Sequence, residues 1–146
     1  MKQQIAIITL GVKDICVSKK FYIEGFGWKP VLENTETVLY QMNGFILSTW
    51  LQHALEQDIQ RSVSKHNGGI TLAHNVASRD KVQKILDILD EYGGKILRNA
   101  DTPPHGGMRG YIADPDNHVW EIIWNPIWHV SKNGYVTYKP KIAEVE

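Results

Sequence analysis

The chain has 146 residues, which is enough for one domain or for two small modules that share a core. Its 42% hydrophobic and 22% charged residues are typical of a globular protein, and its 16 basic residues balance its 16 acidic ones. The zero net charge excludes the basic surface of a nucleic-acid-binding protein and favours self-association.

Three further features bear on where the protein works. No apolar run approaches the roughly 18 residues of a membrane span, so we expect no membrane partner. The apolar run Ile5–Leu10 is too short for a signal peptide. A single cysteine, Cys16, excludes an internal disulfide and fits a reducing compartment. We therefore expect a cytoplasmic protein.

The first third of the chain gives the order β-α-β-β-β. The β-rich run Ile5–Val12 precedes Asp14, a good N-cap for a helix expected over Asp14–Gly25. Asn43-Gly44 is the strongest short hairpin signal in the chain, and it joins the last two strand candidates. The three expected strands are Trp28–Glu33, Thr37–Met42 and Phe45–Trp50.

The same pattern restarts after a polar stretch. Residues 52–68 form a polar linker in which a short helix is expected around Ala54–Val63. A strand over Gly69–Val76 follows, and Ser78 can cap a helix over Asp80–Tyr92 with apolar residues at helical spacing. Lys95–Arg98 is a further strand, and Asn99–Gly107 is a loop. The sequence thus predicts a second β-α-β-β-β unit if a strand forms near Leu97.

The closing segment 110–126 predicts a hairpin. Strands Tyr111–Ala113 and Val119–Trp124 flank the sequence Asp114-Pro115-Asp116-Asn117, in which proline presets φ and Asp and Asn bond back to their own backbone. Strand alternation places Val119, Glu121 and Ile123 on one face, and Trp120, Ile122 and Trp124 on the face that meets a helix.

The segment Tyr-Ile-Ala-Asp-Pro-Asp-Asn-His-Val-Trp-Glu121 resembles the closing hairpin of the glyoxalase / bleomycin-resistance / extradiol-dioxygenase proteins, the vicinal oxygen chelate superfamily. The repeat, with Ile-Thr-Leu-Gly-Val12 against Leu-Ala-His-Asn-Val76, extends the resemblance from about Ile5 to Pro126. The resemblance implies an α+β fold of two tandem βαβββ modules with curled mixed sheets around a central cavity. We assign residues 1–51 and 69–126 to the modules and 127–146 to a C-terminal extension.

The metalloenzymes of this superfamily take ligands from the first and last strand of each module. Carried over position by position, the resemblance implies Ile7 and Thr71 on the first strands, Ser48 or Thr49 on the last strand of module one, and Glu121 on that of module two. Divalent metals bind carboxylate oxygens or imidazole nitrogens, so only Glu121 matches. We expect no metal cofactor, and a divalent metal only if the chain is a metal-dependent lyase, isomerase or dioxygenase.

Several other residues are candidates for contact with an organic ligand. Glu121 is the expected catalytic and binding carboxylate, against the alternative of a structural ion pair with a nearby Lys or Arg. Aromatic side chains can form the wall of a cavity, a loop histidine can form its lip, and an arginine can bind an anionic group. The expected ligand-binding residues are Tyr40, Trp50, His105, Arg109, Tyr111 and Glu121.

These observations favour a protein that holds a small organic molecule in the cavity between the modules, as drug-sequestering relatives do without metal, or that transfers a proton there. A metal-dependent enzyme and a regulatory module with a vestigial cavity stay open as alternatives. We expect a homodimer, but the sequence leaves open whether modules pair within one chain or across two. In residues 127–146, Trp128, Tyr135, Val136 and Tyr138 alternate with polar residues, as in an edge strand or an arm on a partner.

Overall fold

The computed structural model describes residues 1–63, 69–104 and 106–137, and of His129 and Thr137 only the backbone. His105, Tyr138 and the end of the expected linker lie outside these residues. The first unit contains β1 (Ile7–Val12), α1 (Ile15–Lys19), the π-helix η1 (Lys20–Gly25), β2 (Pro30–Glu33), β3 (Thr37–Gln41) and β4 (Ile46–Leu51). The rest contains α2 (Gln52–Ile59), β5 (Thr71–Asn75), α3 (Lys81–Glu91), β6 (Lys95–Asp101), β7 (Met108–Ala113), β8 (Val119–Trp124), β9 (His129–Val130) and β10 (Val136–Thr137).

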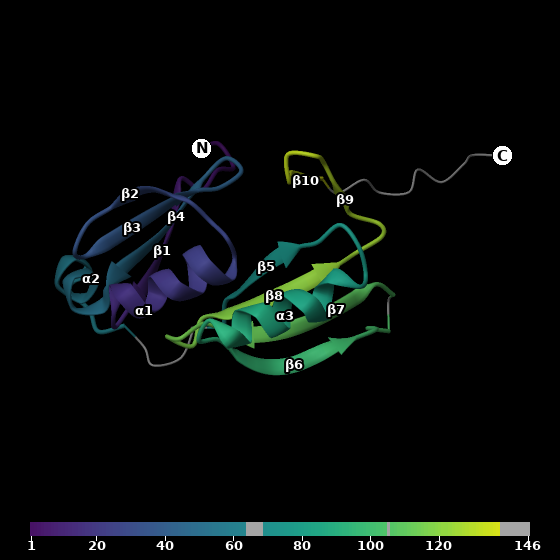
Figure 1. Ribbon diagram of the computed structural model, residues 1–146. Coiled ribbons are helices and arrows are strands. Elements are labelled where there is room, and N and C mark those ends of the chain that lie inside the picture. Colours follow the sequence, from purple (N-terminus) through teal and green to yellow (C-terminus); the bar gives the residue numbers. More distant parts are fainter. Residues whose placement is uncertain (64–68, 105, 138–146) are drawn as a thin grey trace.

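Two four-stranded mixed sheets form the frame of the molecule (Figure 1). Sheet A has the order β1-β4-β3-β2 and sheet B the order β5-β8-β7-β6, so each module repeats the same topology. In both sheets the first strand runs parallel to the last, and the other neighbours are antiparallel. The predicted pair of βαβββ modules is therefore confirmed, although the two sheets do not close around a cavity.

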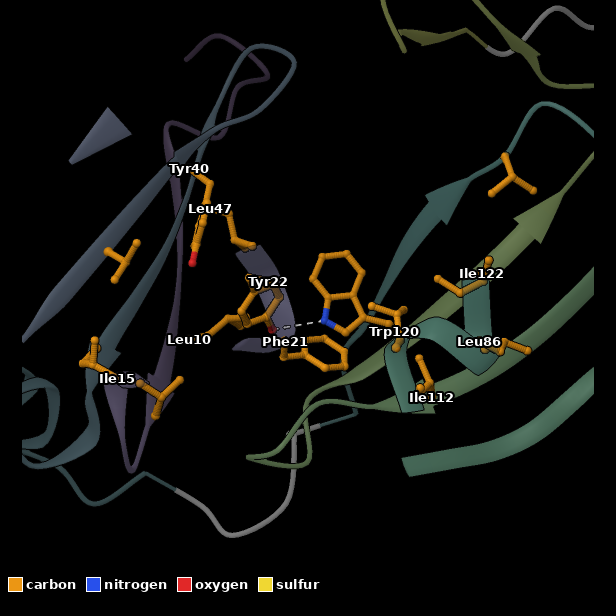
Figure 2. Packing of buried hydrophobic residues seen from close by; sticks show 14 of the residues in the cluster. Leu10, Ile15, Phe21, Tyr22, Tyr40, Leu47, Leu86, Ile112, Trp120 and Ile122 are labelled. Carbon is orange, nitrogen blue, oxygen red and sulfur yellow. Dashed lines mark hydrogen bonds between the residues drawn. The ribbon is translucent and has the colours of Figure 1, made fainter. Parts of the chain in front are cut away.

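The modules pack against each other through their helix-bearing faces. Tyr40 and Leu47 of sheet A and Trp120 of sheet B point toward a shared core, with Phe21 and Tyr22 of η1 between them (Figure 2). Tyr22 is fully buried, and its ring lies 5.8 Å from that of Tyr40 and 6.1 Å from that of Trp120. One core thus serves both modules, and the opposite face of each sheet, which we call its outer face, points away from this core.

The first helix differs from the predicted one in its winding. Asp14 caps α1 as expected, because its carboxylate accepts hydrogen bonds from the backbone N–H groups of Cys16 and Val17. The helix then continues as η1, whose last bond runs from Phe26 N to Phe21 O. The wider turn contains Phe21 and Tyr22, two consecutive residues that are both fully buried.

The other elements follow the predicted order with changed ends. The Asn43-Gly44 hairpin and the turn at 114–117 form as expected, and α2 occupies part of the expected linker. Ser78 is not the N-cap of α3; that position is Asp80, which makes no side-chain cap bond. β6 extends to Asp101, so the loop expected from Asn99 starts later. The boundaries of the modules remain a prediction.

The C-terminal extension forms a small hairpin of its own. β9 and β10 pair with each other, through Val136 with Val130 and Thr137 with His129, and extend neither main sheet. The expectation of an added edge strand is therefore wrong for the described part of this segment. No described helix is both long enough and apolar enough to cross a membrane.

Candidate functional site

The outer face of sheet B carries the expected carboxylate. Glu121 of β8 stands directly opposite Tyr111 of β7, and the Tyr111 hydroxyl donates a hydrogen bond of 2.8 Å to Glu121 Oε1. Burial, together with the neighbouring Glu121 carboxylate, raises the pKa of Tyr111. The phenol therefore keeps its proton at neutral pH and orients the carboxylate as a hydrogen-bond donor.

Arg109 extends this pair into a row of polar side chains. Its guanidinium carbon lies 6.0 Å from the centre of the Tyr111 ring, a cation–π distance. Arg109 also forms an ion pair with Asp101 of β6, to which Arg98 donates bonds of 2.9 and 2.6 Å. The positive charge of Arg109 is thus partly compensated before any anionic ligand arrives.

The six expected ligand-binding residues do not come together in one place. Arg109, Tyr111 and Glu121 share the outer face of sheet B, because strand pairing places residues of equal parity on one face. Trp50 lies on the outer face of sheet A, since it pairs with Thr37, and Tyr40 pairs with Leu47 on the core face. His105 lies outside the described residues. Their roles in ligand binding remain predictions.

A cavity does lie between the modules, but it is separate from Glu121. It has a volume of about 650 Å³ and is bordered by the β3–β4 hairpin, by β5 and by the β9–β10 hairpin. Tyr40 is part of its lining, whereas Trp50, Arg109, Tyr111 and Glu121 are not. The sequence had suggested one site at the module boundary, and the structure separates it into two regions.

The residues at the superfamily's metal-ligand positions do not fit a metal. Ile7 lies on the outer face of sheet A with its hydrocarbon side chain 52% exposed, and it offers no donor atom. Thr71 lies on the outer face of sheet B, where it pairs with Val119, and offers only a neutral hydroxyl. In the described part of the chain no three His, Cys, Asp or Glu side chains are grouped around a possible ion. The family's usual ligand set is therefore incomplete here.

A buried polar network at the closing turn was not predicted from the sequence. The Tyr22 hydroxyl donates a bond of 2.7 Å to Asp114 Oδ2 and accepts one of 3.2 Å from the Trp120 indole. His118 Nδ1 lies 2.8 Å from the same Asp114 oxygen, and only 18% of the His118 side chain is exposed. This network joins η1 of module one to the β7–β8 turn of module two.

Comparison with known proteins agrees with the fold. The sequence profile of the Glyoxalase/Bleomycin resistance protein/Dioxygenase superfamily matches residues 4–122. A crystal structure of a glyoxalase-related enzyme from Fulvimarina pelagi is 50% identical, covers 95% of this chain and all of its own, and superposes with a TM-score of 0.92. The metallothiol transferase FosB of Lysinibacillus sphaericus is 28% identical over 82% of this chain and 81% of its own length. A lactoylglutathione lyase structure from Agrobacterium tumefaciens, 17% identical over 88% of this chain and 98% of its own with a TM-score of 0.66, shares the fold.

Proposed function

The chain belongs to the glyoxalase/bleomycin resistance protein/dioxygenase superfamily, and from this premise we propose that it binds a small organic molecule on the outer face of sheet B. Glu121 is the main polar contact of this ligand and the group that takes a proton from it. The observation that carries this proposal is the 2.8 Å bond between Tyr111 and Glu121 on an open sheet face, with Arg109 beside it.

The geometry leaves one carboxylate oxygen of Glu121 available. Oε1 accepts the bond from Tyr111, and no further hydrogen bond to Glu121 occurs among the described residues. A ligand hydroxyl or amine can therefore donate to Oε2 and pass its proton there, while Tyr111 holds the carboxylate in place. Arg109 lies two residues before Tyr111 on β7, and with only 13% of its side chain exposed it adds a desolvated positive charge to the site.

A second copy of the chain is the natural cover for this site. The outer face of sheet A exposes Ile7 and includes Trp50, while the outer face of sheet B carries the partly buried row of Arg109, Tyr111 and Glu121. An aromatic and aliphatic surface laid over the polar row would exclude water from a bound ligand. We therefore propose a homodimer in which sheet A of one copy faces sheet B of the other.

The second candidate function is metal-dependent group transfer, because relatives at 28% identity are named metallothiol transferases. Against it stand the side chains at the ligand positions, since Ile7 and Thr71 cannot replace imidazole or carboxylate donors. The 50% identical relative is described as a glyoxalase-related enzyme, which supports catalysis without naming the reaction. Metal-free proton transfer at Glu121 is thus the activity we favour.

A ligand screen by thermal shift in the presence of EDTA tests the proposal. A ligand at about 100 times its dissociation constant stabilises a protein by about 2.7 kcal/mol, which in a chain of this size raises the melting temperature by about 5 °C or more. We expect Glu121→Gln to abolish such shifts and Tyr111→Phe to reduce them. Glu24→Gln, an exposed carboxylate on η1, is the matched control that should leave them unchanged. Shifts that persist in Glu121→Gln would refute the assignment.

A further inference from the structure

The inter-module cavity is the second place in the molecule where a ligand fits. Its volume of about 650 Å³ lies within the range of about 300–1,000 Å³ found for small-molecule sites. Both modules and the β9–β10 hairpin contribute to its lining, and Glu121 does not. A ligand bound here would touch residues that the proposed function does not use.

Aromatic groups from three parts of the chain surround this cavity. Trp28 follows η1, Phe45 precedes β4, and Tyr135 belongs to the C-terminal hairpin, with its side chain 53% exposed. His74 of β5 lies beside Trp28, with the two ring centres 6.4 Å apart and the ring planes tilted by 58°. Flat walls of this kind favour a planar ring that can stack against them.

A smaller apolar recess adjoins the main cavity. It has a volume of about 110 Å³, and Trp28, Phe45 and His74 border both spaces. Its other walls come from Ile8, Leu47, Leu72 and Trp120 on the core faces of the two sheets. The end of a ligand that enters here must therefore be apolar, while the opposite end remains in the main cavity, which Lys29 borders.

Charge in the main cavity favours an anion. Among the described residues that line it, Lys29 is the one charged residue apart from the titratable His74, and none is Asp or Glu. Among the described residues Lys29 forms no ion pair, and the ring nitrogens of His74 make no hydrogen bond. Burial lowers the pKa of His74, so its imidazole is neutral near pH 7 and can donate one hydrogen bond.

From these features we propose that the inter-module cavity binds a planar aromatic carboxylate, with its ring against Trp28, His74 and Tyr135 and its carboxylate on Lys29. The apolar recess receives the far edge of the ring system. An aromatic-walled cavity also suits an organic cation, but Lys29 repels a cation, and the described part of the lining holds no carboxylate to compensate it. The charge of the ligand therefore distinguishes an aromatic carboxylate from an aromatic cation as the occupant.

Isothermal titration calorimetry with three naphthalene probes tests this inference. The probes are 2-naphthoate, neutral 2-naphthamide and protonated 2-naphthylmethylamine, which share a ring system and differ in charge. We expect 2-naphthoate to bind with a dissociation constant of about 1 mM or tighter, judged from the binding energy of about 0.3 kcal/mol per atom typical of such ligands. The amide should bind about fivefold more weakly and the amine more weakly still.

Variants locate the bound probe. Lys29→Gln should weaken 2-naphthoate about three- to tenfold and leave 2-naphthamide unchanged, because only the charge-assisted contact is lost. Tyr135→Ala should weaken both probes, and it preserves the hairpin because the residue's own hydrogen bonds to Ser131 come from its backbone. Lys81→Gln, an exposed lysine on α3, is the control for loss of one positive charge.

Glu121→Gln separates this site from the proposed function, since it should leave 2-naphthoate binding intact. The inference is overturned if no saturable binding occurs up to about 5 mM, well above the expected dissociation constant. It is also overturned if the amine binds as tightly as 2-naphthoate, or if Lys29→Gln and Tyr135→Ala behave like Lys81→Gln. Loss of binding in Glu121→Gln would place the probe on the outer face of sheet B and refute a separate site.

Discussion

The buried hydroxyl of Tyr22 connects the two modules, and Tyr22→Phe removes it without removing the ring. The variant loses the bond of 2.7 Å to the Asp114 carboxylate and leaves the Trp120 indole N–H, bonded to Tyr22 at 3.2 Å, without its acceptor. Both Tyr22 and Trp120 are buried, so water cannot replace these bonds at no cost. The aromatic packing around the ring is preserved, and therefore no cavity is created.

The size of the effect follows from these two bonds. A hydrogen bond to a charged group contributes about 1.5–3 kcal/mol, and an unsatisfied buried donor costs about 1 kcal/mol or more. We expect the free energy of unfolding to fall by about 2.5–4 kcal/mol, and the melting temperature by about 5–15 °C. A typical domain has about 5–15 kcal/mol of stability, so the variant should still fold.

Urea denaturation followed by circular dichroism and tryptophan fluorescence measures this loss. Tyr135→Phe is the control, because the Tyr135 side chain is largely exposed and its hydroxyl makes no hydrogen bond within the described residues; its effect should stay below about 0.5 kcal/mol. If the free energy of unfolding of Tyr22→Phe is also within about 0.5 kcal/mol of that of the parent protein, the Tyr22–Asp114 bond does not stabilise the contact between the modules.

Two further perturbations test the packing and the titration of module two. Burial lowers the pKa of His118, but the hydrogen bond to Asp114 and the charges of Asp114 and Asp116 outweigh burial, so the pKa is raised. The contribution of protonated His118 to the free energy of unfolding is therefore full below about pH 6.5, and it is lost as the pH rises through the pKa in the folded protein. The stability difference between the parent protein and His118→Gln, from urea melts, should thus be larger at pH 5.5 than at pH 8, and an equal or opposite difference would contradict this. In Gly110→Ala, the new Cβ would lie 2.4 Å from Leu86 Cδ1 and 2.9 Å from the Arg98 carbonyl oxygen. We therefore expect the free energy of unfolding, measured by thermal melting, to fall by about 1–3 kcal/mol or more. An unchanged melting temperature would show that α3 can move away from β7.

Local patterns in the sequence were sufficient to predict most of the strands. β8 begins and ends where the alternation of Trp120, Ile122 and Trp124 predicted, because one face of that strand is buried against α3 and the other is not. The Asn43-Gly44 turn fixed the β3–β4 pairing in the same way. Where a turn type and a two-residue period agree, the local sequence determines the structure.

The same turn also determines on which face of sheet A two candidate site residues lie. A two-residue loop at Asn43-Gly44 pairs Tyr40 with Leu47 and Thr37 with Trp50, which places Tyr40 and Trp50 on opposite faces of sheet A. Counting residues outward from the turn therefore separates these two side chains on the strength of the sequence alone. Tyr40 and Trp50 therefore cannot line the same wall of one cavity.

Other features depend on contacts that no local pattern reveals. β6 continues to Asp101 through a stretch with two register shifts, because Arg98 and Arg109 pair with that carboxylate from two strands. Asn99 and Asp101 are turn formers by local preference, yet the strand continues through them, and the Arg109–Asp101 ion pair joins β7 to β6 there. The packing of the modules likewise depends on distant pairs such as Tyr22 and Trp120, which lie 98 residues apart in the chain.

We propose above all that Glu121 binds an organic ligand and takes a proton from it without a resident metal. The most direct test is calorimetric titration of the purified, untagged protein with nickel, zinc, manganese and iron(II), with metal content measured before and after. The residues at the ligand positions predict no stoichiometric binding in the parent protein and no difference between it and Glu121→Gln. One metal ion bound per chain, and lost in Glu121→Gln but not in Glu24→Gln, would contradict the account and favour a metal-dependent transferase or lyase.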